Sequence, residues 1–205
     1  MPLAIDASSS GTQILSGLLR DEQGLLYTNV IVADPFAPDN GPVDGYVKVA
    51  EAAIRLIEAP DKAALKALTT TAWARKHALF DDPAVSAWLT RLLTHSKRRK
   101  LAKLIPMPRV YGSKHKSGQK EIEKTLLAEE KDGGLNLDIL AEIKATTNLE
   151  SLEAWQLYKT VTSQLTSYLT MAVDITYPKP MASLNWLRRL ATKALEKQTL
   201  NREKL

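Results

Sequence analysis

Residues 3–19 read LAIDASSSGTQILSGLL, and this stretch decides the predicted fold class. Its first three residues form a short apolar run that ends at Asp6 and a serine-rich cluster, a pattern typical of a strand followed by a turn. Apolar residues then recur at helical spacing, with Ser10 or Thr12 placed to cap a helix and Gly24 placed to end it. We expect the helix to turn four side chains inward, namely Ile14, Leu15, Leu18 and Leu19.

Most of the chain after this stretch has the apolar periodicity of helices. Residues 29–45 contain three prolines and several Asp and Asn residues, and are predicted to be a loop. The predicted helices are 46–59, 62–79, 83–104, 118–131, 135–145, 149–174 and 181–199. Together with the strand at residues 3–5, they predict a mainly α fold with a short β element, an α+β class.

The positive charge of the chain is concentrated in one segment. The net charge is +5, and residues 95–120 carry nine Lys or Arg and no Asp or Glu. Such a segment attracts polyanions, because basic side chains that neutralise phosphates release counterions. A solvated basic helix face is the alternative interpretation. Apolar residues interleaved with the basic ones favour a folded, phosphate-binding segment.

Several classes of protein are excluded by composition. The chain has no cysteine, which rules out disulfides, thiolate metal sites and cysteine nucleophiles. It has no apolar run long enough to span a membrane, and its first residues lack the pattern of a signal peptide. An intracellular, soluble protein is therefore expected.

Two groups of residues could carry chemistry. Asp6, at the predicted strand end, could hold Mg2+ with a backbone carbonyl and water, or could simply cap the following helix. Arg99 and Lys103 are spaced i, i+4, so one helix face would present both cations to a triphosphate. A solvated basic face is again the alternative, and Arg98 and Lys100 flank the pair and could serve instead.

Three segments, taken in order, resemble motifs of single-subunit DNA-directed RNA polymerases of the bacteriophage and mitochondrial type. The first resembles the palm motif Asp-Gly-Ser-x-Ser-Gly-x-Gln followed by Leu-Arg-Asp, and comprises residues 6–13 and 19–21. The second fits the fingers motif Arg-x3-Lys-x3-Met-x3-Tyr-Gly, with Arg99, Lys103, Met107, Tyr111 and Gly112. The third, Leu184-Asn185-Trp186-Leu187, is similar to the start of the last fingers helix.

The resemblance implies an enzyme of transcription, a nucleotidyltransferase that uses a DNA template, ribonucleoside triphosphates and two Mg2+ ions to extend an RNA transcript. Asp6 and the carbonyl of Ala7 would bind metal, with Asp6 and Lys103 as catalytic residues. Arg99 and Lys103 would hold the triphosphate, with Tyr111 and Gly112 at the sugar and base. Residues 1–60 would form part of the palm, and residues 61–205 a helical fingers subdomain.

The chain also departs from the family pattern. Ala7 replaces a Gly, Ile14 replaces a His, and Pro106 and Pro108 would kink or end the fingers helix before Tyr111. The family's second catalytic Asp follows a His, and none of the three histidines here precedes an Asp.

We therefore expect the enzyme to need a complementary polymerase chain. The alternative is a non-catalytic, basic helical protein that binds nucleic acid, such as a polymerase remnant. A phage-encoded enzyme would act in the cytoplasm of a bacterial host, with an organelle as the other location that the resemblance allows.

Overall fold

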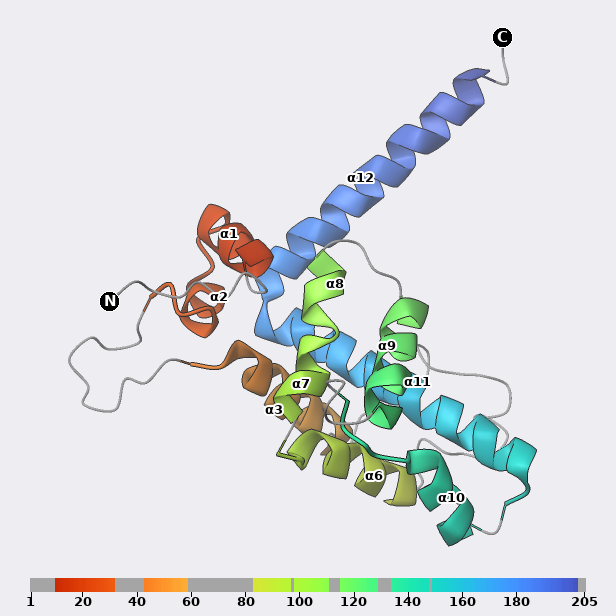
Figure 1. The fold of residues 1–205 in the computed structure, drawn as a ribbon. Coiled ribbons are helices and arrows are strands. Elements are labelled where there is room, and N and C mark those ends of the chain that lie inside the picture. Colours follow the sequence, from red (N-terminus) through yellow and green to blue (C-terminus); the bar gives the residue numbers. More distant parts are fainter. Residues whose placement is uncertain are drawn as a thin grey trace, which may run out of the picture. The chain divides into compact units, whose positions relative to one another are not determined.

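The computed structural model describes residues 10–31, 43–58, 83–96, 98–110, 115–128, 134–147 and 149–202. Ten α-helices lie in this part of the chain (Figure 1). They are α1 (Ser10–Leu18), α2 (Glu22–Tyr27), α3 (Gly45–Glu58), α6 (Pro83–Thr94), α7 (Arg98–Lys103), α8 (Pro106–Val110), α9 (His115–Leu127), α10 (Ile139–Thr147), α11 (Ser151–Thr176) and α12 (Pro178–Arg202).

The predicted α+β class is wrong for the described residues, which contain helices and no strand. The strand expected at residues 3–5 and the helix expected at 62–79 lie outside them. The helical periodicity was the stronger signal because it repeats over many turns, whereas the strand rested on three apolar residues. A strand that short needs neighbouring strands to satisfy its backbone hydrogen bonds.

The chain divides into two compact units. Unit 1 comprises residues 1–43 and 176–205, and unit 2 comprises residues 44–175. This division does not test the predicted assignment of residues 1–60 to the palm and 61–205 to the fingers, which stays a prediction.

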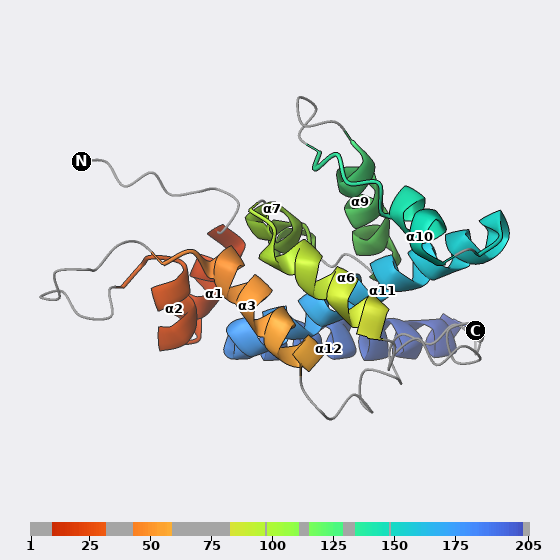
Figure 2. The same ribbon diagram turned by 90° about the horizontal axis from the view of Figure 1, so that it is seen from below.

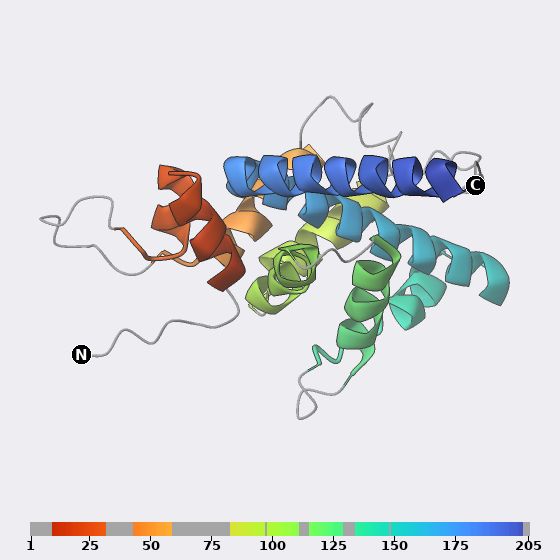
Figure 3. The same ribbon diagram turned by 90° about the horizontal axis from the view of Figure 1, so that it is seen from above.

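Unit 2 has an apolar core to which α3, α6, α7, α9, α10 and α11 contribute fully buried side chains. Helix α3 packs against α6 and α7, and its buried Val49, Ala53 and Ile57 recur at the spacing of one helix face. Helix α9 lies alongside the long helix α11, as Figures 2 and 3 show. The largest fully buried apolar side chains include Leu89, Leu92, Leu93, Leu101, Ile122, Leu126, Ile139, Ile143, Leu165 and Leu169.

The prolines separate α7 from α8, as the sequence predicts. Helix α7 ends at Lys103, a turn follows, and Pro106 is the first residue of α8. Proline suits that position because the first turn of a helix leaves its N–H groups without helical partners. The predicted helix over 83–104 is therefore two helices, α6 and α7, followed by a separate short helix that carries both prolines.

Unit 1 contains α1, α2 and α12. Helix α1 ends at Leu18 because Arg20 adopts a left-handed conformation, with φ of 49°. The N–H of Asp21 then donates to the carbonyl of Ser16 at 2.8 Å, and the N–H of Arg20 donates to that of Gly17 at 3.3 Å. These two bonds form a Schellman cap. The prediction that Gly24 ends the helix is wrong, since Gly24 lies inside α2.

The inward face predicted for α1 is also wrong. Ile14 and Leu18 are 62% and 76% exposed, whereas Thr12 and Ser16, one turn apart, are buried. Helix α12 adds further exposed apolar residues to unit 1, namely Trp186, Leu187 and Leu190. Unit 1 thus presents apolar side chains to solvent on two of its helices.

Candidate functional site

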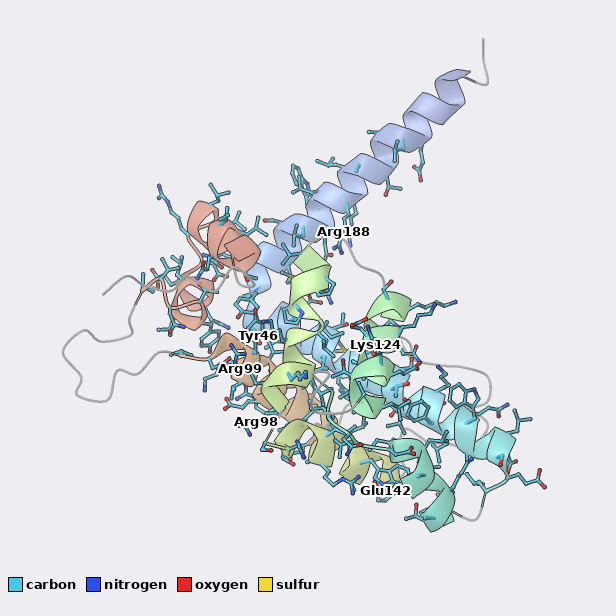
Figure 4. The ribbon with its side chains drawn as sticks, in the orientation of Figure 1. Tyr46, Arg98, Arg99, Lys124, Glu142 and Arg188 are labelled. Carbon is cyan, nitrogen blue, oxygen red and sulfur yellow. The ribbon has the colours of Figure 1, made fainter. Side chains whose placement is uncertain are left out.

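Arg99 and Lys103 lie one helical turn apart on α7, and both reach the same aromatic ring. The guanidinium carbon of Arg99 is 5.1 Å from the centroid of the Tyr46 ring, and the ammonium nitrogen of Lys103 is 6.0 Å from it. Figure 4 labels Arg99 and Tyr46. Tyr46 is on α3 and is buried. Cations are attracted to the electron-rich face of such a ring, so α3 and α7 together hold the two positive charges close to each other.

Asp44 fixes the start of α3 and also contacts Arg99. Its Oδ1 accepts hydrogen bonds from the backbone N–H groups of Tyr46 at 3.0 Å and Val47 at 3.3 Å, as a helix-capping residue does. Its Oδ2 accepts a hydrogen bond from the Nε of Arg99 at 2.5 Å. One carboxylate therefore both begins α3 and orients the guanidinium of Arg99 beside the ring of Tyr46.

The cluster of Asp44, Tyr46, Arg99 and Lys103 can bind an anion that carries more than one negative charge. The side chain of Arg99 is 49% exposed. Lys103 makes no ion pair with any of the residues that the structure describes. A phosphate group could accept hydrogen bonds from both cations, which are stronger than those between neutral groups. Asp44 opposes such an anion by its own charge.

The sequence matches, over residues 1–204, the protein family described as DNA-dependent RNA polymerase. The chain belongs to this family. The match confirms the resemblance to single-subunit RNA polymerases that the three motif segments indicate. No curated protein and no solved structure matches the chain.

The structure brings together two of the site residues predicted for this polymerase chain. Arg99 and Lys103 share one helix face, as their spacing predicts, and both approach Tyr46. Arg98 and Lys100, the flanking alternatives, have no such contact with an aromatic ring in the described residues. Asp6, Ala7, Tyr111 and Gly112 lie outside the described residues, so their roles in the polymerase stay predictions.

Sequence reasoning did not identify Asp44 or Tyr46 as part of this cluster. Asp44 is 55 positions before Arg99, and the contact depends on how α3 packs against α7. One signal could have suggested a cap: an Asp directly precedes the amphipathic pattern that begins at Gly45. Nothing in the spacing of the sequence points to the pairing of Tyr46 with the two cations.

The described residues do not by themselves provide a site for Mg2+. No group of three or more His, Asp or Glu side chains gathers as potential metal ligands within the described ranges. The one carboxylate predicted to bind metal, Asp6, is outside those ranges. Where the chain is described, no helix is both long and apolar enough to cross a membrane.

A second ion pair holds α8, which ends at Val110, directly before Tyr111 in the sequence. Arg109 donates from Nη1 to the carbonyl of Thr170 at 3.0 Å and from Nη2 to both carboxylate oxygens of Asp174, at 2.6 and 2.8 Å. The Arg109 side chain is only 14% exposed. These bonds attach α8 to α11, so the chain enters the segment that contains Tyr111 from a fixed point.

Proposed function

We propose that this chain binds the incoming ribonucleoside triphosphate of a DNA-directed RNA polymerase and carries one part of its catalytic site. The observation that carries the proposal is the approach of Arg99 and Lys103 to one ring, that of Tyr46. Two cations fixed on one surface can stabilise the negative charge that develops on a leaving pyrophosphate. Family membership supports the nucleotide as the anion.

The remaining roles follow the motif positions. Asp6 and the carbonyl of Ala7 would hold Mg2+, which in two-metal sites stabilises both the attacking and the leaving oxygen. Lys103 would donate hydrogen bonds to the triphosphate and Arg99 would add a forked donor. Tyr111 would contact the sugar, and Gly112 would allow the backbone to approach the nucleotide closely. We assign residues 1–60 to the palm and 61–205 to the fingers on the same grounds.

A complementary polymerase chain would supply the second catalytic Asp. None of His77, His95 and His115 is followed by an Asp, so this sequence does not contain the His-Asp pair of the family. The exposed apolar side chains of unit 1 support a protein partner. Ile14 and Leu18, one turn apart on α1, and Trp186 on α12 are each at least 60% exposed, and a protein partner could cover such apolar side chains.

Nucleotide titrations test this proposal. We expect the chain to bind a ribonucleoside triphosphate, and the affinity to fall in Lys103→Ala. The dependence of the affinity on Mg2+ is expected to be lost in Asp6→Ala. Binding to a short DNA duplex should persist in both variants. Templated RNA synthesis is expected only after a chain with the His-Asp pair is added. Robust synthesis by the chain alone would refute the need for a partner.

A second candidate function is non-catalytic binding of nucleic acid by the basic segment. The ion pair between Asp44 and Arg99 favours it, because a carboxylate already occupies part of the guanidinium. In that case a duplex would bind in a salt-dependent manner, and triphosphate would show no saturable binding. The titrations above distinguish the two functions.

A further inference from the structure

Helix α9 is fixed along one face. Its Gln119 donates to the carbonyl of Lys159 at 3.1 Å and to the hydroxyl of Thr162 at 3.2 Å, both on α11. Glu123 of the same face accepts hydrogen bonds from Thr162, at 2.9 Å, and from Lys159. A Cβ on Gly118 would lie 2.9 Å from the Cδ1 of Ile105, so α9 also packs closely there. The orientation of α9 about its own axis is therefore set by these contacts.

The exposed side of α9 carries a row of three lysines. Lys116, Lys120 and Lys124 follow one another at intervals of four residues, and all three are exposed (Figure 4 labels Lys124). No residue in the described ranges forms an ion pair with any of them. The exposed Glu121 lies at the edge of the row, and the other acid of α9, Glu123, is engaged by Lys159. The row therefore has a net positive charge.

We propose that this lysine row, Lys116, Lys120 and Lys124, binds the phosphate backbone of a nucleic acid. Residues four apart are about 6 Å apart along a helix axis, so the row extends over about 12 Å. Duplex DNA carries one phosphate charge per about 1.7 Å of its axis, and the row faces several phosphates at once. Each lysine binds as a compact point charge on a flexible stem, so the row holds nucleic acid without reading its bases.

The surroundings of the row favour nucleic acid over an anionic membrane. A helix that lies on a membrane inserts an apolar face between the lipid headgroups. The apolar face of α9, with Ile122 and Leu126, is buried in unit 2, and Leu127 is the one large apolar side chain of this helix that is exposed. The choice of nucleic acid as the polyanion rests on the proposed function. The lysine row is separate from the cluster of Arg99 and Lys103, so the two can be tested independently.

A salt titration of the full 205-residue chain tests the row. The variant Lys116→Gln/Lys120→Gln/Lys124→Gln removes three charges, and the control Arg55→Gln/Lys144→Gln/Lys193→Gln removes three charges from exposed positions on α3, α10 and α12. Binding to a short DNA duplex and to a single strand is measured by fluorescence anisotropy at several salt concentrations. Unchanged circular dichroism and Tm verify that both variants fold.

For the row variant we expect the slope of log K against log salt to fall in magnitude by about 2–3, at 0.7–0.9 per lost phosphate contact. The control should keep a steeper slope than the row variant, and Lys116→Arg/Lys120→Arg/Lys124→Arg should keep the wild-type slope. Triphosphate binding should not change in the row variant. An unchanged slope, an equal loss in the control, or no duplex binding by the wild type would overturn the proposal. If the row variant loses binding to phosphatidylserine vesicles but still binds the duplex as the wild type does, the row binds a lipid surface and the proposal is overturned.

Discussion

The guanidinium carbon of Arg99 lies 5.1 Å from the centroid of the Tyr46 ring. Lys103 approaches the same ring at 6.0 Å, so two cations that repel each other are both attracted to the face of one aromatic ring. Because Tyr46 is buried between helices, its ring is a fixed point rather than a mobile one. The placement of both cations therefore depends on the packing of α3 against α7.

Asp44→Asn should increase the affinity for a ribonucleoside triphosphate. Asn caps a helix about as well as Asp, so α3 stays intact, while the negative charge beside Arg99 is removed. The repulsion between two unit charges about 4 Å apart in water is about 1 kcal/mol, so its removal should raise the affinity about fivefold. Isothermal titration calorimetry measures this affinity. Asp44→Ala is the matched control, because it also removes the cap and should cost about 1 kcal/mol of stability. Weaker binding in Asp44→Asn would mean that the orientation which Asp44 gives to Arg99 outweighs the repulsion between its carboxylate and the nucleotide.

Arg109→Met should destabilise unit 2. The change removes the hydrogen bonds of Nη2 to both carboxylate oxygens of Asp174 and that of Nη1 to the carbonyl of Thr170. Hydrogen bonds to charged groups contribute about 1.5–3 kcal/mol each, and we expect a loss of about 1–3 kcal/mol in the free energy of unfolding. Chemical denaturation measures it. Asp174→Asn keeps an acceptor oxygen and should cost less, and an equal or larger cost for Asp174→Asn would contradict this account.

Gly134→Ala should be strongly destabilising, although it adds one carbon. A Cβ at this position would lie 1.8 Å from the carbonyl oxygen of Ala128, a backbone atom that cannot move alone. The residues after Gly134 donate backbone hydrogen bonds to the end of α9, including Leu135 to the carbonyl of Thr125 at 2.8 Å. Displacing them should cost on the order of 2–3 kcal/mol, at about 1 kcal/mol per lost bond.

The control for Gly134→Ala is Gly17→Ala on α1. No atom lies within 4 Å of a Cβ built at Gly17. Alanine in an open helical position is more favourable than glycine by about 0.5–1 kcal/mol, so Gly17→Ala should raise Tm or leave it unchanged. If thermal melts give the same shift in Tm for both variants, the close approach of Ala128 to Gly134 does not determine the stability of this region.

The ion pair between Arg91 and Glu142 gives stability a pH dependence. Arg91 Nη1 donates to Glu142 Oε1 at 2.7 Å, and this hydrogen bond lowers the pKa of Glu142. A carboxyl with a lowered pKa contributes stability that is complete above its unfolded pKa of about 4.3 and is lost as pH falls through the folded pKa. Both side chains are partly exposed, so the contribution should be below about 1 kcal/mol.

Arg91→Met isolates that contribution. Urea denaturation at neutral pH should show the wild type more stable than Arg91→Met, and the difference should shrink as the pH falls below the pKa of Glu142. A difference that persists after Glu142 is protonated would show that Arg91 stabilises the protein by packing instead of by charge.

Helices with a long apolar repeat could be predicted from sequence. Helix α3 was predicted at residues 46–59 and observed at Gly45–Glu58, and its Val49, Ala53 and Ile57 are buried, while Ile54 is half-buried. Pro106 was expected to kink or end the helix before it, and the structure ends α7 at Lys103 and begins α8 at Pro106, a position that suits proline. These features are local, so the chain near each residue determines them.

Features that depend on contacts distant in sequence could not be predicted. The inward face of α1 was assigned from Ile14 and Leu18, but the structure buries Thr12 and Ser16 on that helix. The end of α1 at Arg20 was missed because a left-handed arginine has no clear sequence signal, unlike glycine. Tyr46 was predicted only as the start of a helix, because its contact with Arg99 and Lys103 depends on where α7 packs.

The most direct test of the central claim compares two double variants of α7. Arg99→Ala/Lys103→Ala and Arg98→Ala/Lys100→Ala each remove two positive charges from the same helix, and only the first pair contacts Tyr46. A ribonucleoside triphosphate is titrated into each variant and the wild type. We predict at least a tenfold weaker affinity for the first variant, since each lost charge-assisted hydrogen bond costs about 1.5–3 kcal/mol, and an affinity near the wild type for the second. Equal losses in the two variants, or no saturable binding by the wild type, would contradict the account.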